Sequence, residues 1–131
     1  MARPASEHPT ELELTILKVL WRKTPRTVED VREELAENGR ELAHSSVITV
    51  MNIMVRKQYL KRTKNGRAFE YEPLVEGRDV NRGLLDDLVN RVFDGSAKAV
   101  LLELLETSEV DADELLEIRR LIQRRAKECR E

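Results

Sequence analysis

The feature that most constrains this chain is a change in the spacing of its apolar residues near position 59. Before that position, apolar side chains recur at three- and four-residue steps in segments at about 10–23, 27–38 and 44–57, as in amphipathic helices. After it, residues 59–63 and 67–72 alternate, and Asn65-Gly66 lies between them. Asn-Gly favours a type I′ hairpin turn, in which both central residues need positive φ. The sequence therefore predicts three helices followed by a β-hairpin.

The ends of the predicted helices carry their own signals. Thr10 with Glu13 forms a capping-box pattern, and Thr27 is the next expected N-cap. Asn38-Gly39 favours the left-handed conformation that ends a helix. The three helices and the hairpin should share one core, which includes Leu17, Trp21, Val31, Leu35, Val47, Met51 and Leu60.

Three further helical stretches follow the hairpin, at about 80–93, 97–106 and 111–127. Aromatic residues make up only 4% of the chain, and a core of Leu, Val and Ile favours packed helices over a sandwich of strands. The predicted fold is mainly α. A winged helix-turn-helix domain (three helices plus a β-hairpin wing) spans 8–74, and a three-helix C-terminal dimerisation domain spans 75–131.

The apolar residues of the last three helices are numerous for so short a segment. They could form a core within one chain, but about sixty residues in three helices make a thin core. We therefore expect them to pack against a second copy of the chain. The residues assigned to this dimer interface are Leu84, Leu88, Val92, Val100, Leu101, Leu104, Leu105, Leu115, Ile118 and Ile122.

Charge is distributed unevenly along the chain. The net charge is −2, yet residues 42–69 contain six basic residues and no acidic one. A local basic stretch can bind phosphate in a chain that is slightly acidic overall. The alternative is a solvated surface on which basic residues cluster by chance.

The third helix and the hairpin together favour DNA as the partner. Small polar residues on one face of that helix would let its backbone approach the base edges in the major groove, and the basic hairpin would contact phosphates. His44, at the start of the helix, is either a phosphate contact or an ordinary surface residue. The residues assigned to DNA binding are His44, Ser45, Ser46, Thr49, Asn52, Arg56, Lys57, Lys61, Arg62, Lys64 and Arg67.

Five stretches of the chain, in the same order, resemble the penicillinase-repressor family of winged-helix transcriptional repressors. The resemblance covers almost the whole sequence. The stretches are Leu12-Glu13-Leu14-Thr15-Ile16-Leu17 through Leu20-Trp21, Thr27-Val28 with Val31, Leu42-Ala43-His44-Ser45-Ser46-Val47-Ile48-Thr49, Gly66-Arg67-Ala68-Phe69-Glu70-Tyr71 and Asn90-Arg91-Val92-Phe93-Asp94-Gly95-Ser96.

The resemblance implies a homodimer that represses transcription from a palindromic operator, in the regulation of antibiotic resistance. It implies that the C-terminal helices interlock with the partner chain, and that bases are read at Ser45, Ser46 and Thr49. Ile53 stands where the family frequently has Arg. Gln58 stands where the family usually has Gly before the first wing strand.

The resemblance also implies a way of releasing the repressor. In β-lactam-responsive members a membrane sensor protease cuts inside the second C-terminal helix, and the corresponding bond here is Glu103–Leu104. The familiar members have an Asn-Phe pair at that bond. Copper-responsive members carry a C-terminal cluster of cysteines, whereas this chain has only Cys129, which argues against a copper sensor.

Other classes of function fit the sequence less well. The main alternative is a winged-helix protein–protein interaction module without sequence-specific DNA binding. We expect no enzyme, cofactor or metal site, because neighbouring carboxylates such as Asp86-Asp87 fit solvated helix faces and the histidines lack metal-site spacing. No apolar run approaches the ~20 residues that span a bilayer, so we expect a cytoplasmic protein without stable membrane association.

Overall fold

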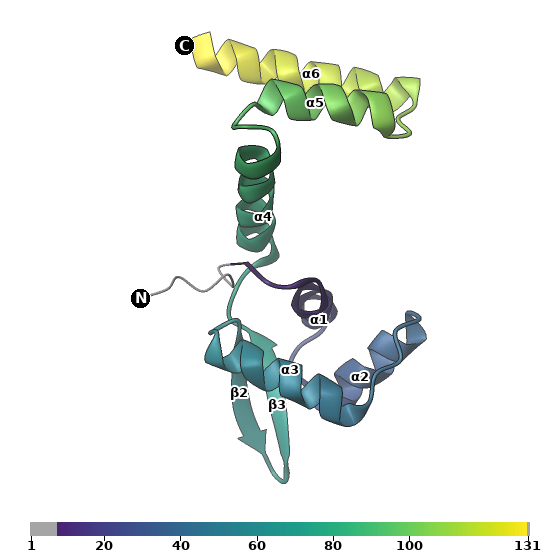
Figure 1. Ribbon diagram of the computed structural model, residues 1–131, viewed down its shortest axis with the longest axis vertical. Helices are drawn as coiled ribbons and strands as arrows, with labels where there is room; N and C mark the ends of the chain where they lie inside the picture. The colour runs from purple at the N-terminus through teal and green to yellow at the C-terminus, as the bar shows by residue number, and fades with distance from the viewer. Residues whose placement is uncertain (1–7, 131) are drawn as a thin grey trace. The chain divides into compact units, whose positions relative to one another are not determined.

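The computed structural model describes residues 8–130, which form six helices and three short strands (Figure 1). These residues divide after Asp86 into two compact units. The mainly α winged helix-turn-helix fold with three further C-terminal helices is confirmed; the domain boundary at 74/75 stays a prediction, and residue 131 lies outside the described range. The elements are α1 (Glu11–Arg22), β1 (Arg26–Thr27), α2 (Val28–Glu37), α3 (His44–Arg56), β2 (Leu60–Asn65), β3 (Ala68–Pro73), α4 (Gly77–Val92), α5 (Ala97–Thr107) and α6 (Ala112–Arg130).

The N-terminal ends of α1 and α2 are closed by capping boxes. The Thr10 hydroxyl accepts a hydrogen bond from the backbone N–H of Glu13, whose Oε1 accepts one in return from the N–H of Thr10. Thr27 and Asp30 make the same reciprocal pair at α2. Each box satisfies amides that the first helical turn leaves without partners, so both predicted starts are confirmed.

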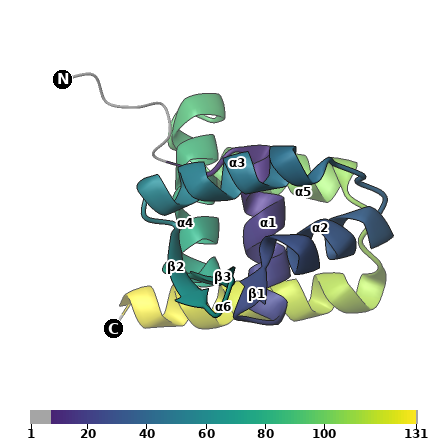
Figure 2. The same cartoon turned by 90° about the horizontal axis from the view of Figure 1, so that it is seen from below.

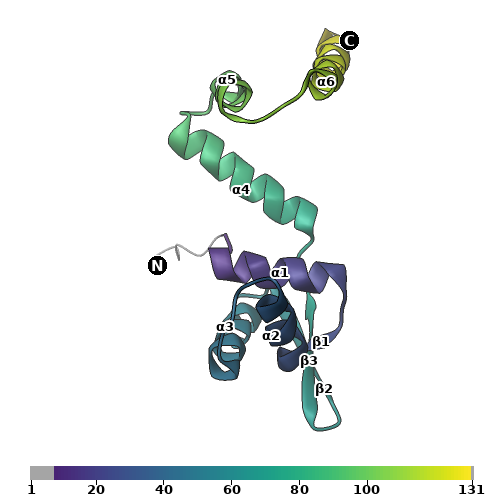
Figure 3. The same cartoon turned by 90° about the vertical axis from the view of Figure 1, so that its right-hand side faces the viewer.

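A single apolar core joins α1, α2, α3 and the sheet. Figures 2 and 3 show α1 lying across α2 and α3. Six of the seven predicted core residues are buried; Trp21 is only partly buried, because its indole Nε1 donates to the backbone oxygen of Val75 at 2.9 Å at the edge of the core. The buried apolar residues are Ile16, Leu17, Val19, Leu20, Val28, Val31, Leu35, Val47, Met51, Met54, Tyr59, Leu60 and Tyr71.

The three strands form one antiparallel sheet in the order β1-β3-β2. The strand β1 was not predicted from the sequence; its two residues, Arg26 and Thr27, pair with Tyr71 and Glu70. It anchors the base of the hairpin to the helices. The hairpin itself, β2 and β3, extends beyond the helices to a free tip (Figure 1).

The two loop residues of the hairpin lie one position later in the sequence than expected, and the turn is of a different type. Asn65 pairs with Ala68, so the two loop residues are Gly66 and Arg67. Gly66 has a φ of +66°, whereas Asn65 and Arg67 do not have positive φ. This pattern is that of a type II′ turn, which needs glycine at its first central position only. The type I′ prediction was therefore wrong, and Arg67 lies at the tip of the wing.

The three C-terminal helices are slightly longer than the spacing predicted. The helix α4 begins at Gly77, three residues earlier than expected, and α6 runs on to Arg130. Ser96 caps α5 by accepting from the N–H of Ala99 at 3.0 Å. None of the described residues of α4, α5 or α6 is buried.

Candidate nucleic-acid interface

The helix α3 presents a small polar face opposite its buried face. Its buried residues are Val47, Met51 and Met54. The Thr49 hydroxyl donates to the backbone oxygen of Ser45 at 2.8 Å, so it retains only acceptor capacity for a further partner. Five of the predicted DNA-binding residues lie exposed on this helix: His44, Ser45, Ser46, Thr49 and Arg56.

The strand register divides the basic residues of the wing between its two faces. Directly opposite residues share a face of the sheet. Arg62 pairs with Tyr71 and Lys64 with Phe69, which places these four on the face that includes the buried Tyr71. Lys61 lies on the other face, opposite Glu72. The sequence analysis assigned Lys61, Arg62 and Lys64 together to DNA binding and did not predict that they lie on different faces.

The wing is joined to α3 through Asn52. The side-chain Oδ1 of Asn52 accepts hydrogen bonds from Arg62 Nη1 at 3.1 Å and from the Tyr71 hydroxyl at 3.1 Å. The Arg62 guanidinium also lies 4.6 Å from the centre of the Phe69 ring. Two residues assigned to DNA binding, Asn52 and Arg62, are therefore bonded to each other. Tyr71 and Phe69 were not assigned, although their alternation with Glu70 was the signal that could have placed them on this face.

Lys57 lies just after α3 and forms an ion pair with α1. Its Nζ is 2.8 Å from Oε2 of Glu13, a carboxylate that is only 3% exposed. The same ammonium lies 5.8 Å from the centre of the Tyr59 ring. Because Glu13 also caps α1, one carboxylate links the first turn of α1 to the C-cap residue of α3.

A groove of about 340 Å³ lies between the start of α3 and the wing. His44 and Arg67 line it together with the apolar side chains of Ile48 and Phe69. Glu29 also lines it, but this carboxylate is engaged by Arg32, whose hydrogen bond and charge hold the pKa of Glu29 below its usual value. The groove therefore brings apolar side chains together with two of the residues predicted to bind DNA, His44 and Arg67.

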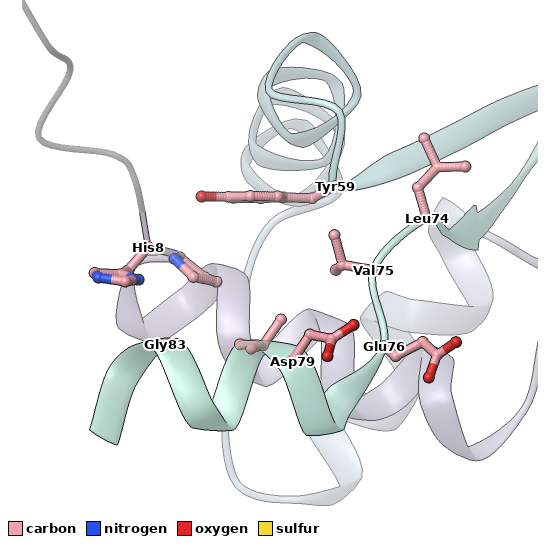
Figure 4. Close-up of a pocket in the computed structure, with 9 residues that line it drawn as sticks. His8, Tyr59, Leu74, Val75, Glu76, Asp79 and Gly83 are labelled. Atoms are coloured by element: carbon pink, nitrogen blue, oxygen red, sulfur yellow. The ribbon is translucent and has the colours of Figure 1, made fainter. Parts of the chain in front are cut away.

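A second cavity, of about 420 Å³, lies beside the ring of Tyr59 (Figure 4). It was not foreseen, because its walls come from separate segments: His8, Tyr59, the connection after β3 and the first turns of α4. Two carboxylates, Glu76 and Asp79, belong to its lining, and burial raises the pKa of the Tyr59 hydroxyl. Across residues 8–130 no group of three or more side chains is arranged to hold a metal ion.

The predicted dimerisation residues lie on apolar faces that residues 8–130 leave largely uncovered. Leu101, Leu104 and Leu105 of α5 are 45–51% exposed. Open apolar hollows lie beside α5 and α6, one of them lined by Leu101 with Ile118 and Ile122. Leu84, Val100 and Ile118 are partly buried, and the other predicted interface residues are exposed: Leu88, Val92, Leu115 and Ile122.

The Glu103–Leu104 bond lies inside α5, with both residues exposed. Within the described range, no helix is long and apolar enough to cross a membrane.

Several known proteins are similar to this chain. A family model described as penicillinase repressor matches residues 9–124. Transcriptional regulator BlaI of Mycobacterium tuberculosis is 36% identical over 115 residues, which cover 86% of this chain and 80% of that protein. The penicillinase repressor of Bacillus licheniformis is 23% identical over 114 residues, covering 87% and 88%. The methicillin resistance regulatory protein MecI of Mammaliicoccus sciuri is 22% identical over 113 residues, covering 86% and 91%.

Solved structures support the fold. A complex structure of hsRosR-S4 covers 95% of each chain with 22% identity and a TM-score of 0.55. The structure of a MarR family protein from Bacillus stearothermophilus covers 96% of this chain and 79% of that one, with 16% identity and a TM-score of 0.53. The family match spans most of the chain and its named members are repressors and regulators, not enzymes. The chain therefore belongs to the penicillinase-repressor family of winged-helix transcriptional repressors.

Proposed function

We propose that this protein is a homodimeric repressor that binds a palindromic operator in duplex DNA through α3 and the wing. The observation that carries the proposal is the strand register, because it sets Arg62 and Lys64 on the wing face that bonds to α3. A polar helix face and a basic hairpin face then lie next to each other. In this arrangement α3 enters the major groove, where Ser45, Ser46 and Thr49 read bases, and the wing contacts phosphates.

The second part of the proposal is that α4, α5 and α6 form their core with a second chain. Helices that leave large leucines about half exposed lack the burial that normally stabilises short helices. The apolar side chains of α5 and α6 line shared open hollows, yet Leu101, Leu105 and Ile122 remain 45–52% exposed. A symmetric dimer would cover these faces and present two copies of α3 to the two halves of the operator.

The third part concerns release of the repressor from DNA. We propose a membrane sensor protease as a partner and Glu103–Leu104 as the bond that it cuts. Because the bond lies within α5, cleavage requires this helix to open locally, which its exposed face favours. Cutting here would divide α5 and separate α6 from the rest of the chain. Repressor and operator would meet in the cytoplasm, without stable attachment of the repressor to the membrane.

The test selects the preferred duplex and then counts the chains that bind to it. Random-sequence DNA is selected against the full-length protein, and the recovered duplex is titrated in an analytical ultracentrifuge. We expect two chains per duplex, an inverted repeat with half-sites separated by roughly 10 base pairs or a multiple, and affinity that falls with salt. One chain per duplex would exclude the dimer. A protein that selects no sequence would favour the alternative, a protein–protein interaction module.

A further inference from the structure

Asn52 lies on α3, but its side-chain oxygen is used by the wing. Oδ1 accepts from Arg62 on β2 and from Tyr71 on β3, each at 3.1 Å. Arginine can only donate, so the atom that faces Arg62 must be the amide oxygen, and the orientation of the Asn52 amide follows from chemistry. An amide oxygen has two lone pairs, and these two donors occupy both. One side chain thus joins α3 to both strands of the wing.

Both donors are held in place by contacts of their own. Tyr71 is 1% exposed, and its backbone pairs with Arg26 of β1. The guanidinium of Arg62 lies over the ring of Phe69, which is two residues before Tyr71, the cross-strand partner of Arg62. The link from Asn52 therefore holds one residue of each wing strand, Arg62 and Tyr71, which lie opposite each other. It fixes both strands of the hairpin relative to α3 at this level.

This arrangement conflicts with a role for Asn52 in reading adenine. An asparagine that recognises adenine uses its oxygen to accept from N6 and its amide nitrogen to donate to N7. The oxygen of Asn52 is already bonded twice. We propose that Asn52 is a positioning residue, which sets the distance between the recognition helix and the wing and does not itself read a base. This inference rests on the proposed binding of DNA by α3 and the wing.

The test uses Lys64 as a reporter of wing contact. The duplex selected by the wild-type protein is titrated over a range of salt, with and without Lys64→Ala. In the wild-type background this change should reduce the salt slope by about one unit, because one phosphate contact is lost. In Asn52→Leu, which has a similar volume but no acceptor, the same change should reduce the slope by less than roughly half a unit, because the wing no longer reaches its phosphate.

Tyr71→Phe supplies the decisive comparison. Tyr71 is buried and cannot contact DNA, yet its hydroxyl is one of the two donors to Asn52. If Asn52 positions the wing, Tyr71→Phe should also shrink the effect of Lys64→Ala, and it keeps the proposal testable should Asn52→Leu fail to fold. Asn52→Asp retains the acceptor, so it should restore the wild-type effect of Lys64→Ala even though its charge lowers affinity overall.

Three outcomes distinguish a positioning role for Asn52, base reading by Asn52 and failure of the proposed DNA binding. An effect of Lys64→Ala that is equal in all backgrounds would overturn the positioning role. Loss of discrimination at one base pair in Asn52→Leu, with Tyr71→Phe behaving as wild type, would show instead that Asn52 reads a base. A wild-type protein that binds no duplex would overturn the proposed function itself.

Discussion

At the scale of single residues, the backbone shows why glycine would suit position 58. Gln58 follows α3 and has a φ of +68°, in the left-handed region. Its N–H donates to the oxygen of Val55 at 3.0 Å, and the N–H of Tyr59 donates to that of Met54 at 2.9 Å. These two bonds form a Schellman motif, whose left-handed position is usually glycine. The end of α3 therefore favours glycine at this position, and this chain makes the same turn with Gln58, a less suitable residue.

Replacing Gln58 with glycine should stabilise the protein. A side chain in the left-handed conformation costs about 1–2 kcal/mol, and the added freedom of glycine in the unfolded chain offsets part of that gain. We expect Gln58→Gly to raise the free energy of unfolding by about 0.5–1 kcal/mol, measured by urea titration.

The matched control is Gly39→Ala. Gly39 ends α2 in the same motif, with a φ of +89°, and an added Cβ there would meet no atom within 4 Å. Any loss of stability in this variant therefore comes from the backbone alone, and we expect about 1 kcal/mol. A loss of stability in Gln58→Gly would mean that the Gln58 side chain makes a contribution larger than the strain.

Glu34 gives a prediction about pH. Hydrogen bonds from Arg22 and then Arg26 hold the pKa of the Glu34 carboxyl below its usual value. A lowered pKa in the folded state stabilises the protein above the ordinary carboxyl pKa, and this contribution is lost as the pH falls through the lowered value. Glu34→Gln should cost roughly 0.5–1 kcal/mol at pH 7, since Arg22 is largely solvated.

The pH series checks the cause of that loss. The unfolding free energies of wild type and Glu34→Gln should converge as the pH is lowered below 4 or so, roughly the ordinary carboxyl range. A difference that stays constant with pH would mean that the variant disturbs packing and not the ion pairs.

At the scale of elements, the wing is best described as two unequal faces. The face with Arg62 and Lys64 bonds to α3. The other face carries Lys61 opposite Glu72, and Glu70 lies on the same side. Acidic side chains there would repel phosphate, so only one face suits a nucleic acid.

This asymmetry predicts different effects for two lysines on one strand. Lys64→Ala should weaken binding to all duplexes alike and reduce the salt slope by about one unit, whereas Lys61→Ala should change the slope little. The measurement is affinity for specific and non-specific duplex at several salt concentrations. Equal effects from the two lysines would show that both faces of the wing approach DNA.

The elements also show where sequence patterns succeed and where they stop. Capping boxes and apolar periodicity located α1, α2 and α3 closely, because these signals lie within a few residues of the features they determine. The strand β1 was not predicted because a segment of two residues shows no periodicity. These two residues form a strand only through their pairing with β3. The link from Asn52 to Tyr71 joins positions 19 apart, so it appears only once the chain is folded.

At the scale of the whole molecule, the two compact units differ in what stabilises them. Residues up to 86 include a dense apolar core. The described residues after 86 have none, although their helices are rich in leucine. The sequence predicts this surplus of apolar side chains. Composition alone does not say whether they pack within one chain or against a second copy.

Placing a charge on α5 should separate the proposed dimer. Leu101 lines an apolar hollow beside Ile118 and Ile122. Burying an aspartate there without a partner would cost several kcal/mol in each subunit, so we expect Leu101→Asp to be a monomer with a folded winged domain. It should hold a half-site weakly, because the second half-site is no longer tethered. Sedimentation velocity and operator titration measure both properties.

Leu74→Asp is the control for adding aspartate at an exposed leucine. Leu74 is 55% exposed and lies outside α4, α5 and α6. This variant should remain dimeric with unchanged operator affinity. If Leu101→Asp also remained dimeric, the leucines of α5 would not form the interface and dimerisation would have to use another surface.

If a second copy covers the leucines of α5 and α6, as proposed, this has a consequence for how much repressor a cell keeps. Helices that complete their core only with a second copy become more stable as the protein becomes more abundant. A copy without a partner would expose opened helices, which housekeeping proteases degrade first. The level of repressor would then set its own lifetime: a scarce repressor is cleared quickly and an abundant one persists. A small fall in synthesis would produce a disproportionate fall in repression.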